Sequence, residues 1–149
     1  MTVTITTDAS FFHDHKMGGY ACWIKSDVGL IKLSAAFKVM VETSTDAEFK
    51  AIINALHLIK LHGWKPTEIY INTDSKNVIN TIEGTGKKLP DYAIRNLHVY
   101  KSIVKELNDP KMLPRHVKAH LHTRTPRHYC NSWCDAEARK AAVKKIFGK

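Results

Sequence analysis

Two segments of the chain end an apolar, β-branched run in an aspartate: Asp8 ends VTITTD (residues 3–8), and Asp74 ends IYINTD (residues 69–74). Both runs have the composition of β-strands, so each carboxylate is expected where a strand ends. Ligands of mixed α/β sheets usually bind at the carboxyl ends of strands, and paired carboxylates are suitable ligands for Mg²⁺ or Mn²⁺. If the two strands are neighbours, this pattern predicts a divalent-cation site between them.

Two more acidic residues, Glu48 and Asp135, are expected near the starts of helices, and each of the four has a simpler explanation. Asp8 could form an Asx-turn, and Asp74 could be the N-cap of the following helix. Glu48 could complete a capping box with Thr45, and Asp135 could interact with a helix dipole. Together they favour another interpretation, because clustered carboxylates repel one another unless protons or cations neutralise them. Two divalent ions about 4 Å apart can hold both the attacking and the leaving oxygen of a phosphodiester.

The composition is that of a basic globular protein. The 149 residues include 23 Lys plus Arg against 14 Asp plus Glu, giving a net charge of +9. This charge favours polyanionic partners such as nucleic acids. The chain has no apolar run as long as a membrane span and no signal-peptide pattern, and its odd number of cysteines is typical of reduced thiols. We therefore expect a monomeric, cytoplasmic protein with no membrane partner.

Hydrophobic periodicity predicts elements in the order β-β-β-α-β-α-α-β-α. The first three runs suit strands joined by short turns, as in an antiparallel meander, and from residue 45 the apolar residues recur at helical spacing. This order predicts one α/β domain over residues 1–149, with a five-stranded mixed sheet and helices on both faces. The expected strands are 2–8, 20–26, 29–39, 68–74 and 113–120, and the expected helices are 45–62, 75–84, 92–107 and 132–147.

Several segments, in the correct order, resemble the ribonuclease H type 1 family. They are TDAS (7–10), GGYACWI (18–24), TDAEFKAIINAL (45–56), INTDSKNVI (71–79), and HVKAH (116–120) followed by NSWCDAEARKAA (131–142). The resemblance covers nearly the whole chain and implies a ribonuclease H-like fold. It further implies a metal-dependent endonuclease that hydrolyses the RNA strand of RNA–DNA hybrids with two Mg²⁺ ions, or Mn²⁺ in their place. The implied products carry 5′-phosphate and 3′-hydroxyl ends.

The same resemblance implies roles for individual residues. Asp8 would contact both metal ions, and Glu48 and Asp74 would flank it at the ion near the leaving O3′. Asp135 would help to hold the ion that activates water. His120, which follows VKA, matches a histidine of the family that assists proton transfer or product release.

Some positions that the resemblance places near the substrate depart from the family pattern. Ala9 replaces a usual Gly, Lys76 a frequent Gln, and Ser44 a common Asn that contacts a 2′-hydroxyl. The segment GTGKKLPDY (84–92) is too short for the basic protrusion with which some members hold the hybrid. The residues expected to contact the substrate are Ala9, Ser10, Ser44, Lys76, Arg124 and Arg127.

The segment HLHTRTPRHYCNSWCD (120–135) is longer than its counterpart in the family and rich in His and Cys. These residues could bind zinc, although their spacing matches no standard finger. The preferred interpretation is a basic loop near the active site, in which Arg124 and Arg127 contact phosphates. Two other functions stay open: a relative on the same fold that cuts DNA, such as a junction resolvase or a transposase-like nuclease, and a catalytically silent nucleic-acid-binding domain.

Overall fold

In the described residues, helices and strands follow one another in the predicted order, with a short 3₁₀ turn (His13–His15) in the first hairpin. The structure, a computed structural model, describes residues 1–84, 88–117 and 126–148, without the side chains of residues 126–128. The strands are β1 (Thr2–Phe12), β2 (Met17–Ser26), β3 (Gly29–Ala36), β4 (Glu68–Thr73) and β5 (Lys111–His116). The helices are α1 (Ser44–Leu61), α2 (Lys76–Glu83), α3 (Asp91–Glu106) and α4 (Pro126–Phe147).

The five strands form one mixed sheet in the order β3-β2-β1-β4-β5. The pairs β1–β2 and β2–β3 are antiparallel, whereas β1–β4 and β4–β5 are parallel. The predicted five-stranded mixed sheet is confirmed. In this order β1, which contains Asp8, lies directly beside β4, which Asp74 follows.

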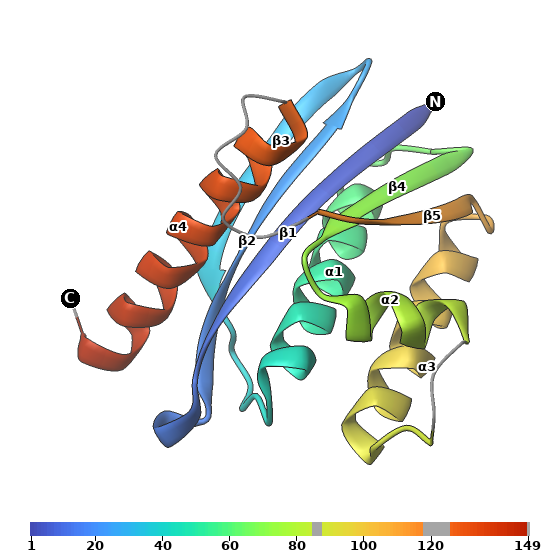
Figure 1. The fold of residues 1–149 in the computed structure, drawn as a ribbon. Helices are drawn as coiled ribbons and strands as arrows, with labels where there is room; N and C mark the ends of the chain where they lie inside the picture. Colours follow the sequence, from blue (N-terminus) through green and yellow to red (C-terminus); the bar gives the residue numbers. More distant parts are fainter. Residues whose placement is uncertain (85–87, 118–125, 149) are drawn as a thin grey trace.

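The sheet lies between two layers of helices (Figure 1). Val3, Ile5 and Ile71 are fully buried in the larger core beneath α1 and α3. On the other face, Cys134 and Ala138 of α4 pack against Ala21 of β2. Helices therefore cover both faces, as predicted. None of the described helices is long and apolar enough to cross a membrane.

Gly19 sets the distance between β2 and α4. A Cβ atom at this position would lie 2.5 Å from the carbonyl oxygen of Ala138 and 2.5 Å from the amide nitrogen of Ala142. Both are backbone atoms of α4, so only a glycine permits this approach. The close contact fixes the height of α4, which carries Asp135, above the sheet.

Several element boundaries differ from the sequence predictions; for example, β2 begins at Met17 and β3 ends at Ala36. Strand β1 continues to Phe12 because it pairs with β2 as far as Met17, whereas its pairing with β4 ends at Thr6 and Asn72. The prediction that Asp8 ends its strand is therefore wrong. Asp8 lies just beyond the last β1–β4 pair, and Asp74 directly follows β4, so both still lie past the point where these strands separate.

Strand β5 covers residues 111–116 rather than 113–120, because its register with β4 begins at Glu68 and Lys111. Helix α4 begins at Pro126 rather than at residue 132, so part of the expected loop 120–135 is helical. Proline is well suited to the first helical turn, where its missing N–H needs no partner. Asp135 is the tenth residue of α4, so it lies too far from the N-terminus of this helix to interact favourably with the helix dipole.

The helix caps also differ from those predicted. Thr43, not Thr45, is the N-cap of α1, and its side chain accepts a hydrogen bond from the backbone nitrogen of Asp46 over 3.0 Å. Ser75, not Asp74, is the N-cap of α2, and its side chain accepts from the backbone nitrogen of Val78 over 3.3 Å. Neither Glu48 nor Asp74 is therefore used as a cap.

Candidate metal centre and active site

Three carboxylates from three different elements meet past the end of the β1–β4 pairing. Asp8 comes from β1, Glu48 from the first turns of α1, and Asp74 from the turn between β4 and α2. One ligand oxygen from each side chain lies within 4.8 Å of the others. In the part of the chain that the structure describes, this is the one group of His, Cys, Asp and Glu side chains with the spacing of a metal site.

The backbone at Ala9 orients two of these carboxylates. Its N–H donates to Oδ1 of Asp8 over 2.9 Å and to Oε1 of Glu48 over 3.2 Å. The other oxygen of Glu48, Oε2, is buried and has no hydrogen-bond partner among the described residues. A buried carboxylate oxygen without a donor is costly, and a bound cation would remove that cost.

The pKa values of the site reflect this shortage of donors. Burial, the negative charge of Asp74 and the neighbouring Asp135 raise the pKa of Asp8 to about 8. Burial and the charges of Asp8 and Asp74 also raise the pKa of Glu48 well above its usual value. In the absence of a cation the cluster therefore retains protons near neutral pH.

Another buried carboxylate, Asp46, has a lowered pKa, in contrast to the raised pKa values of Asp8 and Glu48. Burial alone would raise its pKa, but hydrogen bonds from the backbone of Glu42 and from Lys50 and Asn96 lower it below the usual value. The Glu42 nitrogen donates to Asp46 Oδ2 over 2.9 Å, and Asn96 donates to Oδ1 over 2.7 Å. Asp46 thus accepts hydrogen bonds from three protein donors, whereas Asp8 and Glu48 share the backbone N–H of Ala9.

The donor set at the cluster fits a hard divalent cation. Carboxylate oxygens with no soft ligand among them favour Mg²⁺ or Mn²⁺ over zinc. The fit rests on the buried Glu48 Oε2 and on the close approach of three acidic side chains. Asp8 lies close enough to Glu48 and Asp74 for the three carboxylates to hold one ion, and Asp135 also raises the pKa of Asp8.

The fourth predicted carboxylate, Asp135, lies near Asp8. It is exposed on α4 and is one of the groups that raise the pKa of Asp8. Its distance from the sheet depends on the Gly19 contact. The structure thus groups Asp8, Glu48 and Asp74 as possible ligands of one ion and places Asp135 close to Asp8.

The other predicted site residues are only partly placed. Ser10 is half-buried on β1 two residues after Asp8, and Ser44 and Lys76 are exposed first residues of α1 and α2. The predicted positions of His120 and Arg124 lie outside the described residues, as does the side chain of Arg127. The roles of all these residues in catalysis and binding stay predictions.

The cysteines of the described residues lie in packed positions. Cys134 is fully buried, and its Sγ donates to the carbonyl oxygen of Thr6 over 3.3 Å. Burial raises the pKa of both Cys134 and Cys130, which favours thiols over the thiolates that bind zinc. The remaining residues of the zinc hypothesis, His120, His122 and the side chain of His128, lie outside the described part.

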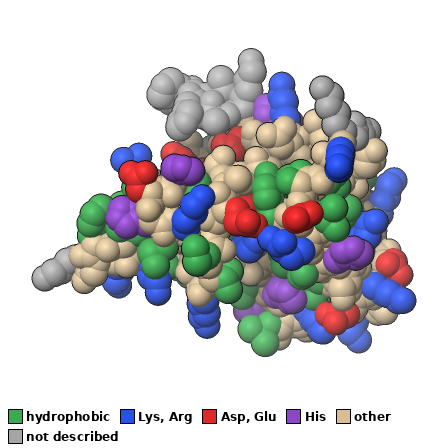
Figure 2. All heavy atoms as spheres, turned by 90° about the horizontal axis from the view of Figure 1, so that it is seen from below, with side chains coloured by type: hydrophobic (Ala, Val, Ile, Leu, Met, Phe, Trp, Pro, Cys, Tyr) green, Lys and Arg blue, Asp and Glu red, His purple; other side chains and the backbone are tan. Residues whose placement is uncertain are grey.

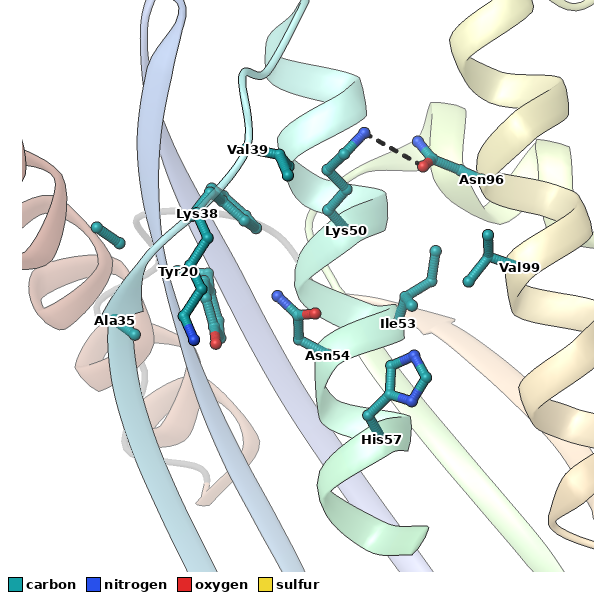
Figure 3. Close-up of a pocket in the computed structure, with 12 residues that line it drawn as sticks. Tyr20, Ala35, Lys38, Val39, Lys50, Ile53, Asn54, His57, Asn96 and Val99 are labelled. Atoms are coloured by element: carbon teal, nitrogen blue, oxygen red, sulfur yellow. Dashed lines mark hydrogen bonds between the residues drawn. The ribbon is translucent and has the colours of Figure 1, made fainter. Parts of the chain in front are cut away.

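An open cavity of about 490 Å³ lies on the α1 side of the sheet, and Asp8 is not among the residues that line it (Figure 3). Residues of β3 and the following loop, α1 and α3 line it, including Lys38, Lys50, Asn54 and His57. Figure 3 shows Lys50 directed toward Asn96 of α3, to which its Nζ donates over 3.3 Å. No acidic side chain lines this cavity, so it is not a second cation site.

The surface that Figure 2 shows carries many Lys and Arg side chains with acidic side chains between them. The positive charge is spread over this face and is not confined to one patch (Figure 2). With a net charge of +9, such a surface attracts polyanions over long distances at low salt.

Sequence reasoning missed two polar residues on the face of the sheet that carries Asp8. Asn72 of β4 is buried, and its Nδ2 donates to Oγ1 of Thr6 over 3.3 Å. Its Oδ1 accepts a hydrogen bond from Nε of Arg115 over 2.9 Å. The available signal was the period-two alternation of Tyr70 and Asn72 with the buried Ile69 and Ile71, because it places Tyr70 and Asn72 on the face of β4 opposite the larger core.

The comparisons with known proteins agree with this arrangement. Residues 1–143 match the RNase H family. LC11-RNase H1, from a compost metagenome and solved in complex with an RNA/DNA hybrid, has a TM-score of 0.77 at 19% identity, and the match covers 97% of this chain and 99% of that one. The N-terminal RNase H domain of a Mycobacterium tuberculosis protein has a TM-score of 0.74 at 17% identity, with 99% and 97% of the two chains covered.

RNase H1 from the archaeon Halobacterium salinarum has a TM-score of 0.68 at 19% identity, over 95% of this chain and 97% of that one. No curated protein sequence matches the chain. The structural similarities show the fold, which is ribonuclease H-like, and the family match covers nearly the whole sequence. The chain, with its cluster of Asp8, Glu48 and Asp74, belongs to the RNase H family.

Proposed function

We propose that this protein is an endonuclease that hydrolyses the RNA strand of RNA–DNA hybrids with the help of two divalent metal ions. The observation that carries the proposal is the convergence of Asp8, Glu48 and Asp74 within 4.8 Å, with one buried oxygen left without a donor. A protein that only bound nucleic acid would gain nothing from gathering carboxylates beside a polyanion. Family membership supports the same chemistry.

Asp8, Glu48, Asp74 and Asp135 would hold the metal ions. When bound, Mg²⁺ or Mn²⁺ supplies charge neutralisation at the scissile phosphate and lowers the pKa of the attacking water. Asp8, which lies between the other acids, would contribute to both ion positions, and the Ala9 N–H would keep the carboxylates of Asp8 and Glu48 oriented. His120 would move a proton or assist product release, as the family resemblance implies.

One comparison supports a hybrid as the substrate, and the net charge supports a nucleic acid in general. LC11-RNase H1, which shares the fold, was solved with an RNA/DNA hybrid. The net charge of +9 favours a nucleic acid of either kind. Contacts to the hybrid would come from the backbone at Ala9, from Ser10, Ser44 and Lys76, and from Arg124 and Arg127.

A comparison of nucleic-acid substrates distinguishes this proposal from the alternative functions. The experiment incubates the protein and Mg²⁺ with end-labelled RNA–DNA hybrid, duplex RNA, duplex DNA and the single strands, all of one sequence. We expect cleavage of the RNA strand of the hybrid alone. Cleavage of duplex DNA at an equal rate would favour the resolvase-like or transposase-like function, and binding without any cleavage would favour a silent nucleic-acid-binding domain.

A further inference from the structure

A row of polar side chains crosses three strands next to the carboxylate cluster. Thr6 of β1 is in register with Asn72 of β4, and Asn72 is in register with Arg115 of β5. Residues in register on neighbouring strands point to the same face of a sheet. This face also carries Asp8, whose partner on β2, Ala21, packs under α4.

Two of the contacts of Arg115 help to hold its side chain in place. Its Nε donates to Oδ1 of Asn72 over 2.9 Å, and its guanidinium carbon lies 4.2 Å from the ring centroid of Tyr70. Asn72 is only 2% exposed, and its own donation to Thr6 fixes the orientation of its amide. A buried asparagine bonded on both sides gives Arg115 a stable support, and the flat ring of Tyr70 limits rotation of the guanidinium.

The row lies one side-chain repeat before the acidic residues along the chain. Asn72 precedes Asp74 by two residues, about 6.6 Å in an extended chain, and Arg115 lies on the neighbouring strand, about 4.8 Å to the side. At this offset the long side chain of an arginine can reach the phosphate next to one held at the cluster. Among the described helices, α4 packs on β1, β2 and β3 and only reaches the edge of β4, and Arg115 on β5 is only partly buried.

We propose that Arg115 is a substrate-positioning residue that binds a phosphate next to the one held at the carboxylate cluster. The proposal rests on the proposed function, because it places the reacting phosphate at Asp8 and Asp74. A guanidinium is planar and offers several N–H donors, which suits phosphate oxygens better than the point charge of a lysine. Asn72 and Tyr70 act through Arg115 by holding it in the orientation that binding requires.

The test is binding of a fluorescently labelled RNA–DNA hybrid in EDTA, measured by anisotropy over a series of salt concentrations. Arg115→Gln should raise Kd about 10-fold at low salt and reduce the slope of log Kd against log salt by about one, as expected for the loss of one phosphate contact. Arg115→Met, which keeps an apolar side chain over Tyr70, should show the same change. Lys101→Gln, an equal loss of charge on an exposed residue of α3, is the matched control and should change Kd less than 2-fold.

Circular dichroism and melting temperature establish that each variant is folded. Wild-type affinity and an unchanged salt slope in either folded Arg115 variant would overturn the proposal, as would an equal effect of Lys101→Gln. Because binding is measured without metal, its result is independent of cleavage. Cleavage of the same hybrid by the wild type in Mg²⁺ tests the proposed function separately, so failure of one is distinguishable from failure of the other.

Discussion

At the scale of single residues, replacing Asp74 tests whether this residue acts as a metal ligand or as a helix cap. Ser75 is the N-cap of α2, so replacing Asp74 by Asn should not weaken the helix. We expect Asp74→Asn to lower Mg²⁺-dependent cleavage more than about 100-fold, the scale of losing a group that acts on the transition state. Its melting temperature without metal should equal or exceed that of the wild type, because charge repulsion in the cluster falls.

The matched control is the neighbouring Ser75→Ala. Loss of the cap should destabilise the protein by about 1 kcal/mol while cleavage of the hybrid stays near the wild-type rate at a temperature where the variant is folded. Steady-state cleavage and thermal melting give both quantities for both variants. Normal cleavage by Asp74→Asn, or a larger loss in Ser75→Ala, would contradict the assignment of Asp74 as a ligand.

The raised pKa of Asp8 gives a pH-dependent stability effect. In the unfolded chain an aspartate titrates near 3.9, whereas in the folded protein the pKa of Asp8 rises to about 8. The folded state therefore binds the proton more tightly, and the wild type loses stability from this group as pH rises from about 4 to 8. Asp8→Asn removes the titration and should melt at least several degrees above the wild type at pH 8 in EDTA, where roughly 2–4 °C corresponds to about 1 kcal/mol.

The informative quantity is the difference in melting temperature between Asp8→Asn and the wild type, measured in EDTA at several pH values. It should be small below about pH 4, where Asp8 is largely protonated in both the folded and the unfolded state, and should grow toward pH 8. A difference that stays constant over this range would show that burial and neighbouring charge do not raise the pKa of Asp8 as the structure indicates.

At the scale of elements, the contact between β2 and α4 controls the position of Asp135. A methyl group on Gly19 would lie 2.5 Å from two backbone atoms of α4, so Gly19→Ala must displace the helix. Overpacking of this kind costs about 1–3 kcal/mol. We expect a lower melting temperature together with a reduced cleavage rate, because Asp135 moves away from Asp8.

Gly29→Ala serves as the comparison for this prediction. A Cβ atom there would approach only the side chain of Trp64, at 3.3 Å, so a small side-chain movement accommodates it. Its melting temperature and cleavage rate should stay close to those of the wild type. Equal effects of the two alanines on stability and cleavage would show that the contact of Gly19 with α4 has no special role.

Most helices and strands were predictable from the sequence, because strand alternation and helical periodicity are local signals. The expectation that Asp8 and Asp74 come from neighbouring strands was also correct. The cap of α1 was not. Thr43, Ser44 and Thr45 are all suitable cap residues, and the hydrogen bonds of Asp46 with the Glu42 backbone and Asn96, a residue distant in sequence, favour Thr43. Once Thr43 is the cap, Glu48 is no longer needed there and is available to the site.

The position of Arg115 beside Asn72 was less predictable. Arg115 follows a proline in an edge strand, and nothing local indicates its partner. Its relation to Asn72 depends on the register between β4 and β5, which only the folded sheet fixes. The start of α4 at Pro126 had a local signal, because proline is frequent in the first helical turn.

At the scale of the whole molecule, the net charge of +9 should control hybrid binding. Positive side chains are spread over the surface seen in Figure 2, so a large share of affinity should come from phosphate contacts that salt weakens. We expect log Kd for a hybrid to rise linearly with log salt, with a slope of several units. Fluorescence anisotropy between low and physiological salt measures it, and a Kd independent of salt would contradict an electrostatic origin.

The most direct measurement on the carboxylate cluster is the rate of hybrid cleavage by the wild type as a function of Mg²⁺ concentration, with the RNA strand labelled and the ends of its products analysed. If Asp8, Glu48, Asp74 and Asp135 hold the catalytic ions, cleavage should be absent in EDTA and rise to a plateau with added Mg²⁺. The new RNA ends should be 5′-phosphates and 3′-hydroxyls. Cleavage that persists in EDTA, or no cleavage of the hybrid at any Mg²⁺ concentration, would contradict a metal-dependent active site at this cluster.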